Sequence, residues 1–77
     1  MKQILEKLLH NKCFGKHHLQ ETTILKGFNR KEHGKLKTTL KQLCKQGLIC
    51  KKPTQHGMSY YLNTCKMEEI QQILDTS

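Results

Sequence analysis

The sequence predicts a mainly helical α+β protein in the order helix, helix, helix, hairpin, helix. Leucine provides 11 of the 77 residues and there is no alanine or valine, so leucine-lined helices are expected to form the core. Two short runs of β-forming residues, 48–52 and 58–62, flank a segment that opens with Pro53 and closes with Gly57. Proline and glycine at such places are typical of a turn, so the two runs predict a β-hairpin.

The first two helices are predicted from the spacing of their apolar residues. Residues 2–11 carry one helical stripe, made of Ile4, Leu5, Leu8 and Leu9. The period breaks at residues 13–15, where Gly15 can adopt a positive φ. A short second helix is expected within residues 17–28, because Ile24, Leu25 and Phe28 form a small patch at helical spacing.

Residues 29–47 predict a long third helix. Asn29 is a suitable N-cap, with Glu32 three residues later as its partner. Gly34 costs about 1 kcal/mol relative to alanine inside a helix, which favours a start nearer His33 than Arg30. The buried stripe consists of Leu36, Leu40, Leu43 and Cys44. Gly47 fits the left-handed position after a helix, with Leu48 folding back as its hydrophobic contact.

The hairpin and the last helix complete the predicted order. If residue 52 faces residue 58, Ile49 and Tyr61 share one face of the ribbon. The other face, expected to be the inner one, then carries Leu48, Cys50, Tyr60 and Leu62. A helix at 64–75 is expected to be capped by Asn63 or Thr64, with acidic residues in its first turn and a stripe of Met67, Ile70, Ile73 and Leu74.

Positive charge is concentrated in the middle of the chain. The 14 Lys and Arg exceed the 6 Asp and Glu, for a net charge of +8. Residues 26–52 hold nine of the cations and one acid, Glu32, whereas the five cations and five acids elsewhere cancel. A field of one sign over a third of the chain favours binding to a polyanion, most commonly nucleic acid. A solvated lysine-rich surface is the alternative.

One face of the predicted third helix is polar and cationic. With Leu40 at the centre of the buried face and about 100° per residue, the opposite side carries Lys31, Lys35, Thr38, Gln42 and Lys45. Such a strip suits the major groove of DNA, which admits an α-helix and presents base edges to Lys, Gln and Thr. It equally fits a solvated helix face. The hairpin that follows adds Lys51, Lys52 and His56, which favours groove binding.

Residues 30–63 carry a resemblance to a known family. They read RKEHGKLKTTLKQLCKQGLICKKPTQHGMSYYLN, with Leu40 and Leu43 followed by Gly47-Leu48-Ile49, a basic strand, a glycine-containing tip and the return strand Tyr60-Tyr61-Leu62. This segment resembles the recognition helix and wing of a winged helix-turn-helix DNA-binding domain. The whole chain, 1–77, is similar to one such domain, with a recognition helix at 29–47, a wing at 48–62 and a C-terminal helix at 64–75. Small prokaryotic, especially archaeal, transcriptional regulators are of this kind.

The resemblance implies roles for individual residues. Lys35, Thr38, Thr39 and Gln42 would reach base edges in the major groove. Arg30, Lys31, Lys41 and Lys45 would contact phosphates at its rims. Lys51, Lys52 and His56 would approach the adjacent minor groove or backbone.

The same sequence features are compatible with other functions. The winged-helix fold also serves as a protein-docking module, here for an acidic partner, and structured RNA is a further possible partner. We expect no enzyme and no cofactor, because six acids leave few pairs for acid–base catalysis. We expect no metal site, because Cys13, Cys44, Cys50 and Cys65 lack paired short spacings. Because the sequence shows neither a membrane span nor a signal peptide, the expected location is the cytoplasm. No small-molecule substrate is evident.

A homodimer is expected from the small core and from the family resemblance. The apolar stripe of the last helix either covers the first helix within one subunit or forms, with it, a face for a second copy. The candidate dimer residues are Leu5, Leu9, Ile70, Ile73 and Leu74, and Cys13 or Cys65 offers a disulfide link. A two-fold dimer would hold its recognition helices roughly 34 Å apart and read a palindromic site.

Overall fold

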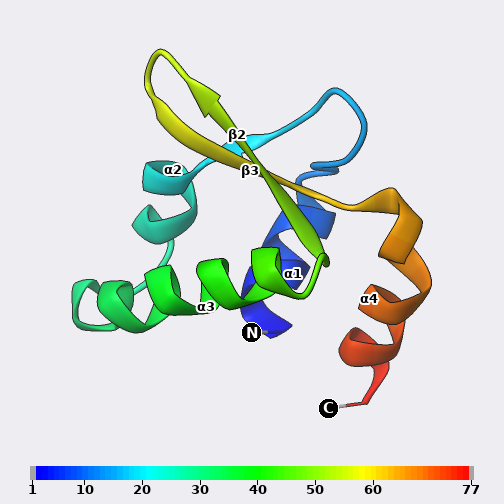
Figure 1. Cartoon of the computed structure of the whole chain (residues 1–77). Helices are drawn as coiled ribbons and strands as arrows, with labels where there is room; N and C mark the ends of the chain where they lie inside the picture. Colours follow the sequence, from blue (N-terminus) through cyan, green and yellow to red (C-terminus); the bar gives the residue numbers. More distant parts are fainter. Residues whose placement is uncertain (1, 77) are drawn as a thin grey trace.

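A computed structural model describes residues 2–76, in which helices pack against a small antiparallel sheet (Figure 1). The elements are α1 (Lys2–His10), β1 (Leu19–Gln20), α2 (Glu21–Lys26), α3 (His33–Lys45), β2 (Ile49–Thr54), β3 (Gly57–Leu62) and α4 (Met67–Asp75). Single 3₁₀ turns, Arg30–Glu32 and Thr64–Lys66, precede α3 and α4. The predicted α+β class is therefore confirmed. No helix within residues 2–76 has the length and apolarity needed to cross a membrane.

Lys12 ends α1 in the left-handed region of backbone conformation. Its φ is 54°, and its amide donates to the Leu9 carbonyl at 3.0 Å, while the Cys13 amide donates to the Leu8 carbonyl at 2.9 Å. Many helices end with this pair of hydrogen bonds, usually with glycine in the left-handed position. Gly15 has the predicted positive φ, 68°, but it lies in the loop that follows. The helix therefore ends in a backbone conformation that is unfavourable for Lys12.

The segment between α1 and α3 contains a strand that no sequence pattern predicts. β1 is two residues long and pairs antiparallel with β3, with Leu19 opposite Tyr60. The expected short helix follows as α2, which buries Ile24 and Leu25. Lys7 Nζ of α1 donates to the Ile24 carbonyl at 3.2 Å. A cation at these terminal carbonyls is favourable, so α1 holds the C-terminal end of α2 in place.

Asn29 caps the start of the third helical segment and Gly47 follows its end, as predicted, but no hydrogen bond within residues 2–76 joins the Glu32 side chain to Asn29. The Asn29 side chain accepts a hydrogen bond from the Lys31 amide at 3.1 Å, and the α-helical part begins at His33 after one 3₁₀ turn. At the other end, Gly47 has a φ of 79°. The Leu48 amide donates to the Leu43 carbonyl at 3.1 Å, and Leu48 is buried against the core. The chain thus turns directly from α3 into β2.

The hairpin register differs from the prediction by one residue. Ile49 pairs with Leu62 and Lys51 with Tyr60, and the ladder closes at Thr54 opposite Gly57, so Pro53 lies inside β2. Because side chains alternate along a strand, the shift moves Ile49 to the inner face and Cys50, opposite Tyr61, to the outer face. The sheet order is β1-β3-β2, so β2 is an edge strand, where proline is tolerated.

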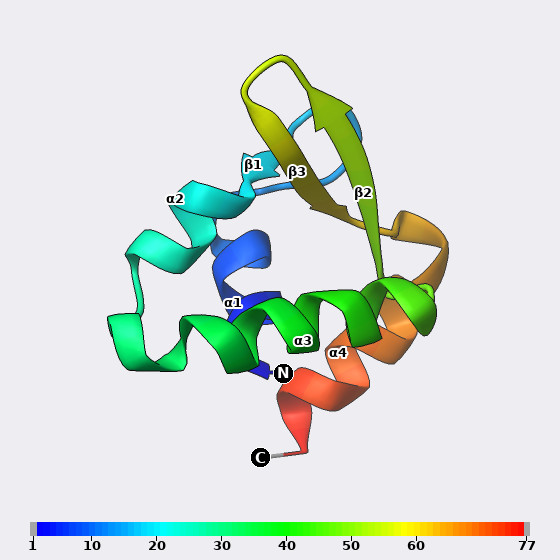
Figure 2. The ribbon, with the colours of Figure 1, turned by 60° about the vertical axis from the view of Figure 1, so that its left-hand side comes forward.

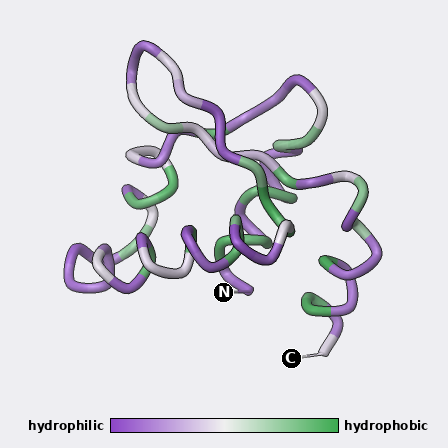
Figure 3. The backbone as a smooth tube through the Cα atoms, viewed as in Figure 1, coloured by the Kyte–Doolittle hydropathy of each residue, from purple (hydrophilic) through white to green (hydrophobic). Residues whose placement is uncertain are grey.

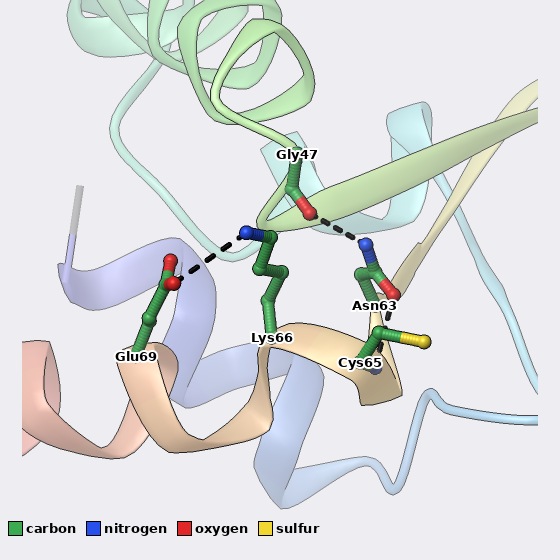
Figure 4. A network of polar contacts seen from close by, with 5 residues as sticks. All are labelled: Gly47, Asn63, Cys65, Lys66 and Glu69. Atoms are coloured by element: carbon green, nitrogen blue, oxygen red, sulfur yellow. Dashed lines mark hydrogen bonds and ion pairs between the residues drawn. The ribbon is translucent and has the colours of Figure 1, made fainter.

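Asn63 joins the hairpin to the last helix (Figure 4). Its Nδ2 donates to the Gly47 carbonyl at 2.8 Å, and its Oδ1 accepts from the Cys65 amide at 3.0 Å. The predicted cap at Asn63 is confirmed, although it caps the 3₁₀ turn and α4 itself begins at Met67. Asn63 therefore ties the end of α3 and the start of α4 to the same point.

The core lies where α1, α3 and α4 meet the inner face of the sheet. Its fully buried apolar residues are Ile4, Leu5, Leu8, Ile24, Leu40, Leu43, Ile49, Leu62 and Ile70. Figure 2 shows α3 running across the body while the β2–β3 hairpin rises away from its C-terminal end. In Figure 3, α1, the start of β2 and α4 contain the hydrophobic stretches, whereas much of α3 and the hairpin turn is hydrophilic. The hydrophilic part of α3 includes Lys35, Lys37, Lys41 and Lys45.

Candidate nucleic-acid interface

Residues 26–52, here called the basic segment, expose every one of their cations. These are Lys26, Arg30, Lys31, Lys35, Lys37, Lys41, Lys45, Lys51 and Lys52. The ion pairs described within residues 2–76 join Lys2 to Glu6 and Lys66 to Glu69, each at 3.5 Å, and both lie outside this segment. Its nine positive charges are therefore free to face a polyanion.

The outward face of α3 carries only part of the predicted base-reading set. Thr38, Gln42 and Lys45 lie opposite the buried leucines when about 100° is counted per residue. Lys35 and Thr39 lie on a flank, where they line a hollow of about 160 Å³ together with Gln3 of α1. The four residues predicted to contact bases therefore do not form one strip. The reason is that the centre of the buried face lies between Leu36, Leu40 and Leu43.

The two threonine hydroxyls of this region are already bonded to the helix. Thr38 Oγ1 donates to the Gly34 carbonyl at 3.2 Å, and Thr39 Oγ1 donates to the Lys35 carbonyl at 2.9 Å. Thr39 is also half-buried, whereas Thr38 is exposed. In this arrangement the Thr38 oxygen is an available acceptor, which suits the amino group of adenine or cytosine rather than an acceptor atom of guanine.

The basic residues of the hairpin point to different sides. Lys51 lies opposite Tyr60 on the inner face of the sheet, and Lys52 lies opposite Ser59 on the outer face. His56 is exposed in the turn, where its amide donates to Thr54 Oγ1 at 3.3 Å. Lys51 and Lys52 were predicted to act together, but strand alternation separates them. Arg30 and Lys31 are exposed in the 3₁₀ turn before α3.

Basic residues of α3 and of the hairpin meet at one hollow, here called the basic hollow. It has a volume of about 550 Å³ and is lined by Glu21, Lys41, Cys44, Lys45, Lys51, Met58 and Tyr60. Two of its lysines come from the second half of α3 and one from β2. Lys41 and Lys45 of α3 and Lys51 of β2 therefore line the same hollow, whereas Lys52 lies on the outer face of the sheet.

A hydrogen bond between Tyr60 and Glu21 crosses the floor of the basic hollow. The Tyr60 hydroxyl donates to Glu21 Oε1 at 3.3 Å. Burial and the negative charge of Glu21 raise the pKa of Tyr60 to about 12, so the hydroxyl stays protonated at neutral pH. Burial likewise raises the pKa of the Cys44 thiol, an effect that the positive charge of Lys51 opposes. Neither Tyr60 nor Cys44 is thus poised as a nucleophile.

The cysteines are free thiols in this structure. Cys13 is buried, Cys44 and Cys50 are half-buried, and Cys65 is exposed. Burial raises the pKa of the Cys13 thiol, and its place in the core leaves Cys65 as the exposed candidate for a link between subunits. Over residues 2–76, no three His, Cys, Asp or Glu side chains are grouped so that they could hold a metal ion.

The residues predicted for a dimer face are partly used inside the chain. Leu5 and Ile70 are fully buried where α1 packs against α4, so they have no surface to offer a second copy. Their inclusion in the dimer face is therefore corrected: the covering of α1 by α4 within one chain is what the structure shows. Leu9, Ile73 and Leu74 pack on the same core but remain half-buried.

Comparison with known proteins adds no relative. No family model matches the chain, and neither a curated protein nor a solved structure matches it.

Proposed function

We propose that the chain is a double-stranded DNA-binding transcriptional regulator of the winged helix-turn-helix kind. In this proposal α3 enters the major groove and the β2–β3 hairpin is the wing. The order α1-β1-α2-α3-β2-β3 and the pairing of β1 with the return strand β3 support it, because a short first strand that joins the hairpin belongs to that fold. The resemblance of residues 30–63 to a recognition helix and wing supports it independently of the topology.

The observation that carries the proposal is the exposure of the basic segment. All nine of its cations are exposed, and none forms an ion pair within residues 2–76. A protein surface with unpaired cations gains affinity for DNA by releasing the counterions condensed on the phosphates. Nine cations against the single acid Glu32 leave this third of the chain with a strong excess of positive charge.

The positions on α3 and the hairpin suggest which groups read bases and which hold the backbone. Gln42 and Thr38 lie on the outward pole of α3 and are the proposed base contacts. Lys41, Lys45 and Lys51 surround the basic hollow and are the proposed phosphate contacts nearest the wing. Phosphate contacts set register and affinity, whereas base contacts set sequence preference.

Binding to labelled duplexes tests the proposal. Fluorescence anisotropy should show an affinity that falls about a thousandfold between 50 and 200 mM salt if six phosphates are contacted. Duplexes selected from a random pool should share a sequence, and Gln42→Ala should flatten that preference by about 1 to 3 kcal/mol at one base pair. Gln72→Ala, which changes an exposed glutamine of α4, is the matched control. Affinity that is insensitive to salt, or no binding to any duplex, would refute DNA binding.

The same cations also fit an acidic protein, which is the second candidate. A pull-down that retains one acidic partner after nuclease treatment, together with no retardation of any duplex, would favour the docking function. Light scattering in the same buffers measures the subunit number, and a palindromic selected site requires a dimer on DNA.

A further inference from the structure

The basic hollow combines positive charge with an apolar floor. Its lysines come from two elements, α3 and β2, while Met58, Cys44 and the ring of Tyr60 supply apolar surface. Tyr60 is 6% exposed, and Met58 and Cys44 are half-buried. The hollow between α4 and the connection from α3 to β2 contrasts with it: that site measures about 310 Å³ and is lined by Gln46, Leu48, Glu69, Gln72, Ile73 and Thr76, with no cation.

The charges of the basic hollow do not cancel. Three ammonium groups line it against one carboxylate, Glu21, and that carboxylate already accepts the Tyr60 hydroxyl. Among the described residues no ion pair joins any of these lysines to an acid. An anion placed between Lys41, Lys45 and Lys51 would therefore gain charge-assisted hydrogen bonds without first displacing an internal partner.

The size of the basic hollow suits a small molecule. Its volume of about 550 Å³ lies within the range of roughly 300 to 1,000 Å³ that is usual for small-ligand sites, which pair an apolar lining with a few polar groups. A methionine such as Met58 can adapt its shape to a flat apolar group. Tyr60 offers the edge or face of an aromatic ring at the same site.

We propose that the basic hollow binds a small organic anion with an aromatic or similarly flat apolar body. The anionic group lies among Lys41, Lys45 and Lys51, and the apolar body lies on Met58, Cys44 and Tyr60. The proposal of this binding site depends only on the residues that line the basic hollow. Because its lysines also belong to the proposed DNA interface, an occupied hollow competes with DNA, and only this consequence rests on the proposed function.

Titration with phenyl phosphate, in the absence of DNA, tests the site. Two-dimensional amide NMR spectra should show saturable shifts concentrated at Glu21, Cys44, Lys45, Lys51, Met58 and Tyr60. Inorganic phosphate should bind at least about tenfold more weakly, since it lacks the apolar body, and phenol should bind more weakly still, since it lacks the charge.

Neighbouring lysines on opposite faces of β2 provide a matched pair of variants. Lys51→Gln should weaken phenyl phosphate binding about tenfold, whereas Lys52→Gln removes the same charge from the outer face and should change it less than about twofold. Glu21→Gln should strengthen binding, because it removes a like charge and its amide oxygen still accepts the Tyr60 hydroxyl. Both lysines are exposed, so neither variant is expected to unfold the protein.

Three results would overturn the site. Equal affinities for inorganic phosphate and phenyl phosphate would show that the apolar floor takes no part. Equal effects of Lys51→Gln and Lys52→Gln, or shifts spread over lysines of both faces, would show general attraction to a basic protein. Duplex binding without any of the ligand effects would leave the DNA proposal standing and remove this one.

Discussion

Replacing Asn63 by alanine should lower the free energy of unfolding by about 2 kcal/mol. The side chain makes two hydrogen bonds: Nδ2 donates to the Gly47 carbonyl at 2.8 Å and Oδ1 accepts from the Cys65 amide at 3.0 Å (Figure 4). Loss of a capping acceptor costs about 1 kcal/mol, and loss of a partly buried hydrogen bond costs about 1 kcal/mol more. The two losses should add, because the bonded groups lie at the ends of different helices.

Asn29 provides the control for this prediction. Its side chain makes a single capping bond, to the Lys31 amide at 3.1 Å, and it is exposed. Asn29→Ala should therefore cost only about 1 kcal/mol. Changing each asparagine to aspartate separates the two functions, because a carboxylate keeps the capping acceptor and loses the donor. Asn29→Asp should be nearly neutral, whereas Asn63→Asp should cost about 1 kcal/mol or more, since a carboxylate then faces the Gly47 carbonyl.

Urea unfolding followed by far-ultraviolet circular dichroism measures these differences. Asn63→Ala, Asn63→Asp and Asn29→Ala should lower the transition midpoint and Asn29→Asp should leave it nearly unchanged, all without a change of slope, since the buried surface is the same. A loss of 2 kcal/mol corresponds to roughly 8 to 16 °C in the unfolding temperature of a domain of this size. If Asn63→Asp is as stable as the unmodified chain, or Asn63→Ala costs no more than Asn29→Ala, the bond to Gly47 contributes nothing and the reasoning fails.

Three further predictions concern strain, a buried hydroxyl and a titration. Lys12→Gly should raise the stability by about 1 kcal/mol in urea unfolding, since φ is 54° there, and Lys12→Ala should not. Ser59 is fully buried and its Oγ has no hydrogen-bond partner within residues 2–76, so Ser59→Ala should raise the free energy of unfolding by about 1 kcal/mol; a clear loss of stability would mean that the hydroxyl is satisfied. The pKa of Tyr60 is raised to about 12, above the ordinary value of about 10, so its contribution to stability is complete below about pH 10 and is lost as the pH rises to 12. Ultraviolet absorbance should show this late tyrosinate step, and Tyr60→Phe should remove its part of the signal and leave that of Tyr61, whose pKa is also raised by the neighbouring Cys50.

The ends of the helices could be predicted because their signals are local. Asn29 bonds to an amide two residues away, and Gly47 lets Leu48 reach a carbonyl five residues back. Such bonds depend on the conformational preference of one or two residues, so a sequence of five or six residues contains the necessary information. Lys12 shows the limit of this reasoning, because it adopts the left-handed conformation where a lysine would not be expected to do so.

The hairpin register could not be predicted from the same kind of signal. Pro53 and Gly57 indicate a loop between them, but Pro53 lies in β2 and the turn residues are Gln55 and His56. Proline is allowed there because β2 is the outer strand, and β2 is outer because β1 takes the other edge of β3. β1 contains two residues, too few for an alternating pattern to be recognised.

The sequence alone predicts the basic segment, its net charge and the polar side of the third helix. Charge and helical periodicity depend on residues that are near one another along the chain. Which cations gather at one place was decided by the fold. Lys51 lines the hollow beside Lys41 and Lys45 while its neighbour Lys52 faces away, and Glu21 and Tyr60 enter from other elements. That selection follows from a one-residue register and from the packing of α2 against the sheet. Both are set by contacts between residues distant in sequence, since a strand's faces exchange with each single step in pairing.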